Sequence, residues 1–174
     1  QLLKYLYMRD SYRGFAYMWD KVYKKEILRE ADGTMILFDE NLTLGGDVLY
    51  LAKVALNTKR AKYINRSFYH YYQRETSGCH TRDVSKLKDW LKAYEMVIAL
   101  FEQKGIEREI LSYVERFLAY HSSNAAEIAY ENKKKEMLKL FQNIMEFYQK
   151  SYLNLNIQYP ERIERYLRIM KLQL

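Results

Sequence analysis

The sequence predicts a mainly α-helical (α+β) protein, in which a segment with a short β-hairpin is followed by an antiparallel helical bundle. Only one proline and six glycines occur among 174 residues, which leaves little material for long irregular segments. Hydrophobic residues make up 49% of the chain, a proportion that favours folding over disorder. From Asp83 onward, apolar residues recur at alternating spacings of three and four, the periodicity of an α-helix. We therefore expect two parts, residues 1–82 and residues 83–174.

The first part is predicted to combine short helices with short strands. The expected helices cover residues 1–9, 21–30 and 47–57, and the expected strands cover residues 14–19, 62–65 and 67–73. A tight connection separates the last two strands, which would form the hairpin. Asp32-Gly33 has the composition of a turn. The chain begins inside a helical pattern without a capping residue, so we expect the natural protein to continue upstream.

The second part is predicted to contain four helices joined by short loops. Their expected ranges are about 84–103, 106–131, 133–150 and a last helix that follows Pro160. His121 and Asn124 share the inward face of the second helix, where buried polar groups need partners, so we expect a hydrogen-bonded pair. Basic and apolar residues accompany each other over residues 159–174. This last helix either packs against the bundle or lies on an anionic membrane surface.

Charge and cysteine content exclude several classes of function. The formal net charge is +7, which suits an anionic partner such as a nucleotide diphosphate or a membrane surface. No nucleic-acid-binding motif is present, so nucleic acid is not an expected partner. The single Cys79 cannot form an internal disulfide, and the histidines lack metal-ligand spacing, so no metal site is predicted in this chain. No apolar run reaches the roughly 18 residues that cross a bilayer, and no signal peptide is present, so we expect a cytoplasmic location.

The segment Gly45-Gly46-Asp47 holds the leading candidate for a catalytic residue. Two glycines let the backbone turn sharply, and Asp47 directly precedes an apolar helical pattern. A carboxylate at such a place faces the positive end of the helix dipole. Two interpretations follow from the residues alone: Asp47 caps a helix, or it is a general base held at the floor of a cleft.

Three further segments strengthen the second interpretation. They are Met18-Trp19-Asp20-Lys21-Val22-Tyr23-Lys24, Phe38-Asp39-Glu40-Asn41-Leu42, and Phe68-Tyr69-His70-Tyr71-Tyr72-Gln73-Arg74-Glu75-Thr76-Ser77. In this order and spacing, the four segments resemble the second half of the catalytic domain of inverting family 2 glycosyltransferases, which have a GT-A fold. The family pattern runs Trp-Asn-Lys-Leu-Tyr-Lys, then Phe-x-Glu-x-Leu, then Gly-Glu-Asp-x-x-Phe, and then Tyr-x-Tyr-Arg-x-x-x-Ser.

The resemblance implies a role for each matching residue. Asp47 would be the catalytic base that takes a proton from the acceptor hydroxyl. The substrate-binding residues would be Trp19, Lys21, Arg74, Ser77 and His80. In relatives, the segment that corresponds to residues 74–82 closes over the nucleotide diphosphate. From the residues alone, Trp19 is favoured as a core residue over a position in an acceptor pocket, and residues 74–82 could equally be a solvated loop.

The match departs from the family pattern at three places. Gly46 replaces the glutamate before the catalytic aspartate, Asp20 replaces the asparagine after the tryptophan, and Arg74 stands closer to Ser77 than in the family. The half that binds the nucleotide-sugar donor, with its Asp-x-Asp metal motif, is not in this sequence. The resemblance therefore implies that the full-length enzyme uses a nucleotide-sugar and a divalent metal, Mg²⁺ or Mn²⁺. This chain by itself would have no cofactor and no activity.

The implied function is transfer of a sugar from a nucleotide-sugar to a saccharide or lipid-linked acceptor in polysaccharide biosynthesis. An enzyme that uses lipid-linked acceptors would work peripherally, at the inner face of the plasma membrane. The alternative is a helical module without catalysis that packs on a partner or forms a homodimer, since the helical stripes from Val84 onward permit association. An Asp47 in an open cleft favours the first function, and an exposed apolar patch on the helices favours the second.

Overall fold

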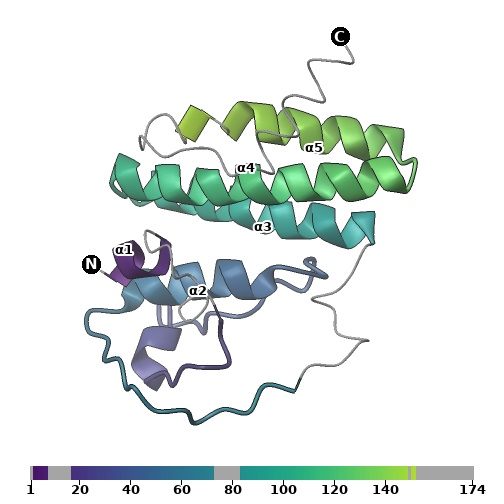
Figure 1. Cartoon of the computed structure of the whole chain (residues 1–174). Coiled ribbons are helices and arrows are strands. Elements are labelled where there is room, and N and C mark those ends of the chain that lie inside the picture. The colour runs from purple at the N-terminus through teal and green to yellow at the C-terminus, as the bar shows by residue number, and fades with distance from the viewer. Residues whose placement is uncertain (1, 8–16, 73–82, 149, 152–174) are drawn as a thin grey trace.

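The computed structural model describes residues 2–7, 17–72, 83–148 and 150–151, and within them the chain is mainly α-helical. Five α-helices and one 3-10 helix pack as a bundle (Figure 1). They are α1 (Leu2–Tyr7), η2 (Lys25–Leu28), α2 (Gly46–Asn57), α3 (Val84–Gln103), α4 (Arg108–Glu131) and α5 (Lys135–Tyr148). The predicted helical class and the predicted helix at the start of α2 are thereby confirmed.

Helices α3, α4 and α5 form an antiparallel stack with α4 in the middle, and α2 packs on the other side of α3 (Figure 1). The loops that join α3 to α4 and α4 to α5 are short, which requires these helices to run in opposite directions. Both loops close the preceding helix in the same way. The residue after the cap has a positive φ, 63° at Gly105 and 55° at Lys133, and the following N–H groups bond back to carbonyls of the last turn. Gly105 therefore ends α3 as the sequence predicts.

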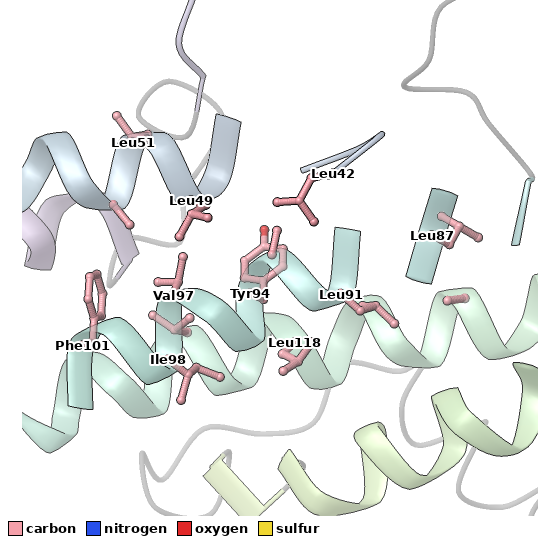
Figure 2. Packing of buried hydrophobic residues seen from close by; sticks show 14 of the residues in the cluster. Leu42, Leu49, Leu51, Leu87, Leu91, Tyr94, Val97, Ile98, Phe101 and Leu118 are labelled. Carbon is pink, nitrogen blue, oxygen red and sulfur yellow. The ribbon is translucent and has the colours of Figure 1, made fainter. Parts of the chain in front are cut away.

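The hydrophobic core joins residues from both predicted parts of the chain. Tyr94 and Val97 point from α3 toward Leu42 and Leu49, and Leu118 of α4 lies on the other side of α3 (Figure 2). Val97 and Leu118 are fully buried. Burying one such aliphatic side chain stabilises a fold by roughly 1.5–3 kcal/mol. The loop before α2 and α2 itself are therefore held in place by α3.

The helix predicted over residues 21–30 is wrong except for the 3-10 turn η2. A turn at Asp32-Gly33, as predicted, pairs the end of this segment with the residues that follow, and Arg29 and Met35 form an isolated antiparallel bridge. The Asp32 carboxylate accepts a hydrogen bond from the Thr34 N–H at 2.9 Å, and the glycine of the turn has a φ of 85°. This local turn chemistry outcompetes a helix that would bury little apolar surface.

The predicted β-hairpin does not form in residues 62–72, which carry no strand. All side chains from residue 59 to residue 72 are exposed. A two-stranded hairpin is marginal in water without a third strand or a packed apolar face, and the described part of the chain has no strand to pair with this segment. The expected strand over residues 14–19 falls largely outside the described residues, and the expected helix after Pro160 falls entirely outside them.

Candidate functional site

The first turn of α2 presents the candidate base, Asp47, to solvent. The N-cap of α2 is Gly45, with a φ of 86°, and the helix begins at Gly46. Asp47 is therefore inside the first turn and is not the capping residue. Its Oδ1 accepts a hydrogen bond from the Val48 N–H at 2.9 Å. The electropositive end of the helix suits a carboxylate at this position.

Helix α3 holds the start of α2 in place. A Cβ on Gly45 would lie 2.8 Å from Cδ1 of Trp90 and 3.0 Å from Cβ of Ala93, so a larger residue does not fit without displacing α3. Two residues earlier, Thr43 donates its N–H and its hydroxyl to Oδ2 of Asp89, at 3.1 Å and 2.6 Å. The neighbouring helix thus determines where the carboxylate of the first turn projects.

Gly46, in contrast, has room for a side chain. A Cβ at this position would lie 3.5 Å from Cδ1 of Phe38, which is an ordinary van der Waals contact. Its φ is not positive. Steric crowding therefore does not explain why glycine stands where the resembling family has a glutamate.

An aromatic cluster joins two segments that are far apart in the sequence. The Trp19 ring lies nearly parallel to the rings of Tyr17, Tyr69 and Tyr71, at centroid distances of 5.0, 4.8 and 5.1 Å. An indole has two faces, so at least two of the tyrosines share one face. The four side chains remain between 38% and 51% exposed. Trp19 therefore belongs to a surface cluster and not to the core.

Lys21 is held at the side of this aromatic cluster. Its Nζ donates to the backbone carbonyl of Tyr17 and to Oδ1 of Asp20, both at 2.5 Å. Asp20, which stands where the resembling family has an asparagine, thus forms an ion pair with the adjacent lysine. These two contacts hold the ammonium group at the backbone of Tyr17, one residue of the cluster.

A second pair of rings lies beside the start of α2. Phe38 and Tyr50 stack with a centroid distance of 4.5 Å and an interplanar angle of 9°. Burial, assisted by the charges of Asp20 and Tyr50, raises the pKa of Tyr23 to about 12. The Tyr23 hydroxyl donates a hydrogen bond to Sδ of Met18 at 3.4 Å.

The structure brings some of the predicted site residues together and leaves others apart. Trp19 stacks on Tyr69 and Tyr71, and Lys21 is bonded to the backbone carbonyl of Tyr17, whose ring also stacks on Trp19. The carboxylate of Asp47, in the first turn of α2, accepts a hydrogen bond from the Val48 N–H. Three predicted residues lie outside the described residues: Arg74, Ser77 and His80. The predicted diphosphate-binding segment therefore stays a prediction.

His121 lies among aromatic rings between α3 and α4. Its ring centroid is 4.2 Å from that of Trp90, 5.6 Å from that of Tyr94 and 5.4 Å from that of Tyr120. The predicted hydrogen bond with Asn124 is wrong, because the buried Nδ1 has no hydrogen-bond partner within the described part of the chain. Burial lowers the pKa of His121 to about 4. The inward position was predictable from helical spacing, but the aromatic surroundings come from another helix.

The sequence analysis did not find a buried polar cluster that joins α4 to the residues after α5. The carboxylate of Glu115 accepts a hydrogen bond from the Arg108 guanidinium at 2.7 Å and another from the Ser151 hydroxyl. Glu115 and Ser151 are buried. Burial, followed by the charges of Glu95, Glu115 and Glu102, raises the pKa of Tyr148 nearby to about 12. The signal in the sequence that could have revealed this cluster is Glu115, a charged residue within the apolar stripe of α4.

The described part of the chain contains neither a candidate metal site nor a candidate membrane-spanning helix. No group of three or more histidine, cysteine, aspartate or glutamate side chains there could hold a metal ion. None of the helices there combines the length and the apolar character that crossing a membrane requires. Comparison with protein-family models, with curated proteins and with solved structures finds no match.

Proposed function

We propose that this chain is the acceptor-side part of an enzyme that transfers a sugar, with inversion, from a nucleotide-sugar to a saccharide or lipid-linked acceptor. The observation that carries this proposal is the aromatic cluster around Trp19. It joins two of the four segments on which the family resemblance rests. Helix α2, which carries the candidate base Asp47 in its first turn, lies between these segments in the chain.

The aromatic cluster has the chemistry of a sugar-binding surface. The faces of aromatic rings carry partial negative charge, and the C–H bonds on one side of a pyranose ring carry partial positive charge, so the two stack favourably. The hydroxyls of Tyr17, Tyr69 and Tyr71 add donors and acceptors for sugar hydroxyls. Because these rings remain between 39% and 51% exposed, a saccharide can reach them without unfolding the segment.

Asp47 supplies the group that the reaction requires. In an inverting transfer, the acceptor oxygen attacks the anomeric carbon while the nucleotide diphosphate leaves from the opposite side, and a base takes the acceptor proton. The exposed carboxylate in the first turn of α2 could accept that proton, and α3 holds its backbone in position. By the family resemblance, Mg²⁺ or Mn²⁺ and the nucleotide-sugar belong to the half of such an enzyme that binds the donor.

The experiment measures the release of nucleoside diphosphate from UDP-sugars by the full-length protein, with and without a panel of saccharide acceptors. The substitution Asp47→Asn keeps the shape of the side chain and removes the base, so we expect kcat to fall by at least about 100-fold. Glu136→Gln, which neutralises an exposed carboxylate in the first turn of α5, is the matched control and should leave kcat unchanged. Normal turnover by Asp47→Asn would rule out Asp47 as the base.

Two further measurements test the acceptor surface around Trp19 and the assignment of the donor site to another half of the enzyme. Trp19→Ala should raise the KM for the acceptor by about tenfold and leave the KM for the UDP-sugar nearly unchanged, because stacking binds only the acceptor. Equal changes in both KM values would argue against an acceptor surface at the cluster. Sugar transfer by residues 1–174 without an upstream half would contradict the assignment of the donor site.

The alternative function, a helical interaction module, receives less support from the exposed apolar side chains. Most of the large apolar side chains that are exposed lie in residues 17–72, outside α3, α4 and α5. On the described helices of the stack, the exposed large apolar side chains are Tyr130 and Phe147, which belong to different helices. A homodimer of this chain stays a prediction.

A further inference from the structure

We propose that residues 59–72 form a contact surface for an anionic phospholipid bilayer. This segment, here called the basic strap, follows the C-terminal end of α2. It runs along the edge of the molecule that lies farthest from α4 and α5 (Figure 1). All side chains of the strap are exposed. The inference goes beyond the proposed sugar transfer and does not depend on it.

The basic strap concentrates positive charge without any compensating acid. It contains Lys59, Arg60, Lys62 and Arg66 and no aspartate or glutamate, so its formal charge is +4 out of +7 for the whole chain. Within the described residues, no carboxylate forms an ion pair with these four side chains. Exposed basic groups of this kind are attracted to the negative surface potential of membranes rich in anionic lipid.

The same segment also exposes large apolar side chains. Tyr63 is 72% exposed, Ile64 58%, Phe68 69% and Tyr72 83%. Tyrosine is enriched at the level of lipid headgroups, where its ring meets the acyl chains and its hydroxyl meets water. Isoleucine and phenylalanine gain free energy when they enter the boundary between headgroups and acyl chains. Basic and apolar groups are therefore interleaved as they are in interfacial membrane contacts.

The backbone of the strap sets the depth of this contact. The strap has no regular hydrogen-bonded structure, so its N–H and C=O groups need water or polar partners. Such a backbone cannot enter the hydrocarbon region, whereas water and phosphate groups satisfy it in the headgroup layer. The strap is therefore suited to lie on the bilayer surface with only its apolar side chains inserted.

A bilayer fits the strap better than a single-stranded nucleic acid does. Nucleic-acid surfaces of this kind use aromatic faces on which successive bases stack. In the strap, the rings of Tyr69 and Tyr71 already stack against Trp19, and Ile64 offers no stacking face. An exposed aliphatic side chain between basic residues gains from lipid and not from bases.

The test is sedimentation of the full-length chain with vesicles of phosphatidylcholine alone or of phosphatidylcholine mixed with phosphatidylglycerol. We expect binding to the mixed vesicles, weakened by salt, and little binding to phosphatidylcholine alone. Neutralising the strap should weaken binding to the mixed vesicles by more than about 100-fold, since each basic residue near an anionic surface contributes roughly fivefold. This variant combines Lys59→Gln, Arg60→Gln, Lys62→Gln and Arg66→Gln.

Two control variants remove as many or nearly as many charges elsewhere. The first neutralises exposed lysines of the helical stack and its loop: Lys86→Gln, Lys88→Gln, Lys104→Gln and Lys139→Gln. The second neutralises the basic C-terminal segment: Arg162→Gln, Arg165→Gln and Arg168→Gln. We expect both controls to lose less than about tenfold in affinity, because their charges are not in the strap. Far-UV circular dichroism checks that each variant is folded.

An apolar variant separates insertion from charge attraction. Ile64→Ser together with Phe68→Ser keeps all four basic residues and replaces exposed side chains, so the fold should persist. Wild-type binding to mixed vesicles should retain a part that high salt does not remove, because it comes from insertion of apolar side chains. We expect this variant to lack that salt-resistant part.

The proposal would be overturned by absent binding of the chain to mixed vesicles. It would also be overturned by a neutralised strap that binds like wild type, or by a C-terminal variant that alone abolishes binding. Tighter binding of single-stranded polyuridine than of mixed vesicles, lost in the strap variant, would instead identify a nucleic-acid surface.

Discussion

His121, a half-buried side chain whose Nδ1 is enclosed, shows how a single residue makes stability depend on pH. The unfolded chain protonates this imidazole near its ordinary pKa of about 6.5, whereas burial lowers the pKa to about 4 in the folded protein. Between these two values the unfolded state binds more protons, so the free energy of unfolding falls as the pH falls. The contribution is complete above about pH 6.5 and is lost progressively toward pH 4, by roughly 3 kcal/mol in all.

The substitution His121→Phe tests this dependence. Phenylalanine does not titrate and leaves no unpaired Nδ1 among the rings of Trp90, Tyr94 and Tyr120. In urea unfolding, we expect the variant to lose roughly 2–3 kcal/mol less than wild type between about pH 7 and about pH 4.5. Carboxylates contribute equally to both proteins, so the difference isolates the imidazole. An identical pH dependence in the two proteins would contradict a His121 that stays neutral in the folded protein.

Glycine at position 45 combines a positive φ with close packing, and two other glycines separate these effects. Gly45→Ala forces a Cβ to 2.8 Å from Trp90, so we expect a loss of about 2–4 kcal/mol in the free energy of unfolding. Gly33→Ala has a φ of 85° but open space, so it should lose only about 1 kcal/mol. Gly46→Ala has neither constraint and should change stability by less than about 1 kcal/mol. Equal losses for the first two variants would show that packing against α3 is unimportant.

At the scale of elements, a buried polar contact joins α4 to the residues that follow α5. The Ser151 hydroxyl donates to the buried carboxylate of Glu115, which Arg108 also contacts. Ser151→Ala should therefore reduce the free energy of unfolding by about 1.5–3 kcal/mol, because a buried charge loses a hydrogen bond. Asn143→Ala, on the exposed side of α5, is the matched control and should be nearly neutral. Urea unfolding of both variants provides the measurement.

The same scale shows where local sequence patterns succeed and where they fail. Helices α3, α4 and α5 were predictable within a few residues because each has a continuous apolar stripe and a recognisable end, such as Gly105. The prediction of a helix over residues 21–30 was wrong because the turn at Asp32-Gly33 pairs Arg29, near the end of this segment, with Met35. The predicted hairpin over residues 62–73 does not form in residues 62–72, the part that the structure describes. Side chains that alternate between two faces produce a strand only where a partner strand is present.

At the scale of the molecule, the shared core predicts a single unfolding transition in spite of the two predicted parts. Leu49 of α2 is 4% exposed and faces α3, so Leu49→Ala should lower the free energy of unfolding by about 2–4 kcal/mol. Amide hydrogen exchange should then accelerate equally in α2 and α3. Leu37→Ala, at a leucine that is 72% exposed, is the matched control and should change neither. Faster exchange confined to α2 would show that the parts unfold separately.

The sequence by itself determined the helical class, the ranges of the long helices and the identity of the candidate base. Helical spacing and helix ends are local properties, so they can be read from neighbouring residues without knowledge of the fold. The position of Asp47 in the first turn of α2 belongs to this group within one residue, although the cap itself is Gly45.

Only the tertiary structure decided how distant segments meet. The stacking of Trp19 on Tyr69 and Tyr71, and the packing of Gly45 against Trp90, join residues that no local pattern connects. The unpaired Nδ1 of His121 likewise depends on a ring supplied by another helix. The physical reason is that burial and stacking depend on the whole folded chain, whereas periodicity depends on one element at a time.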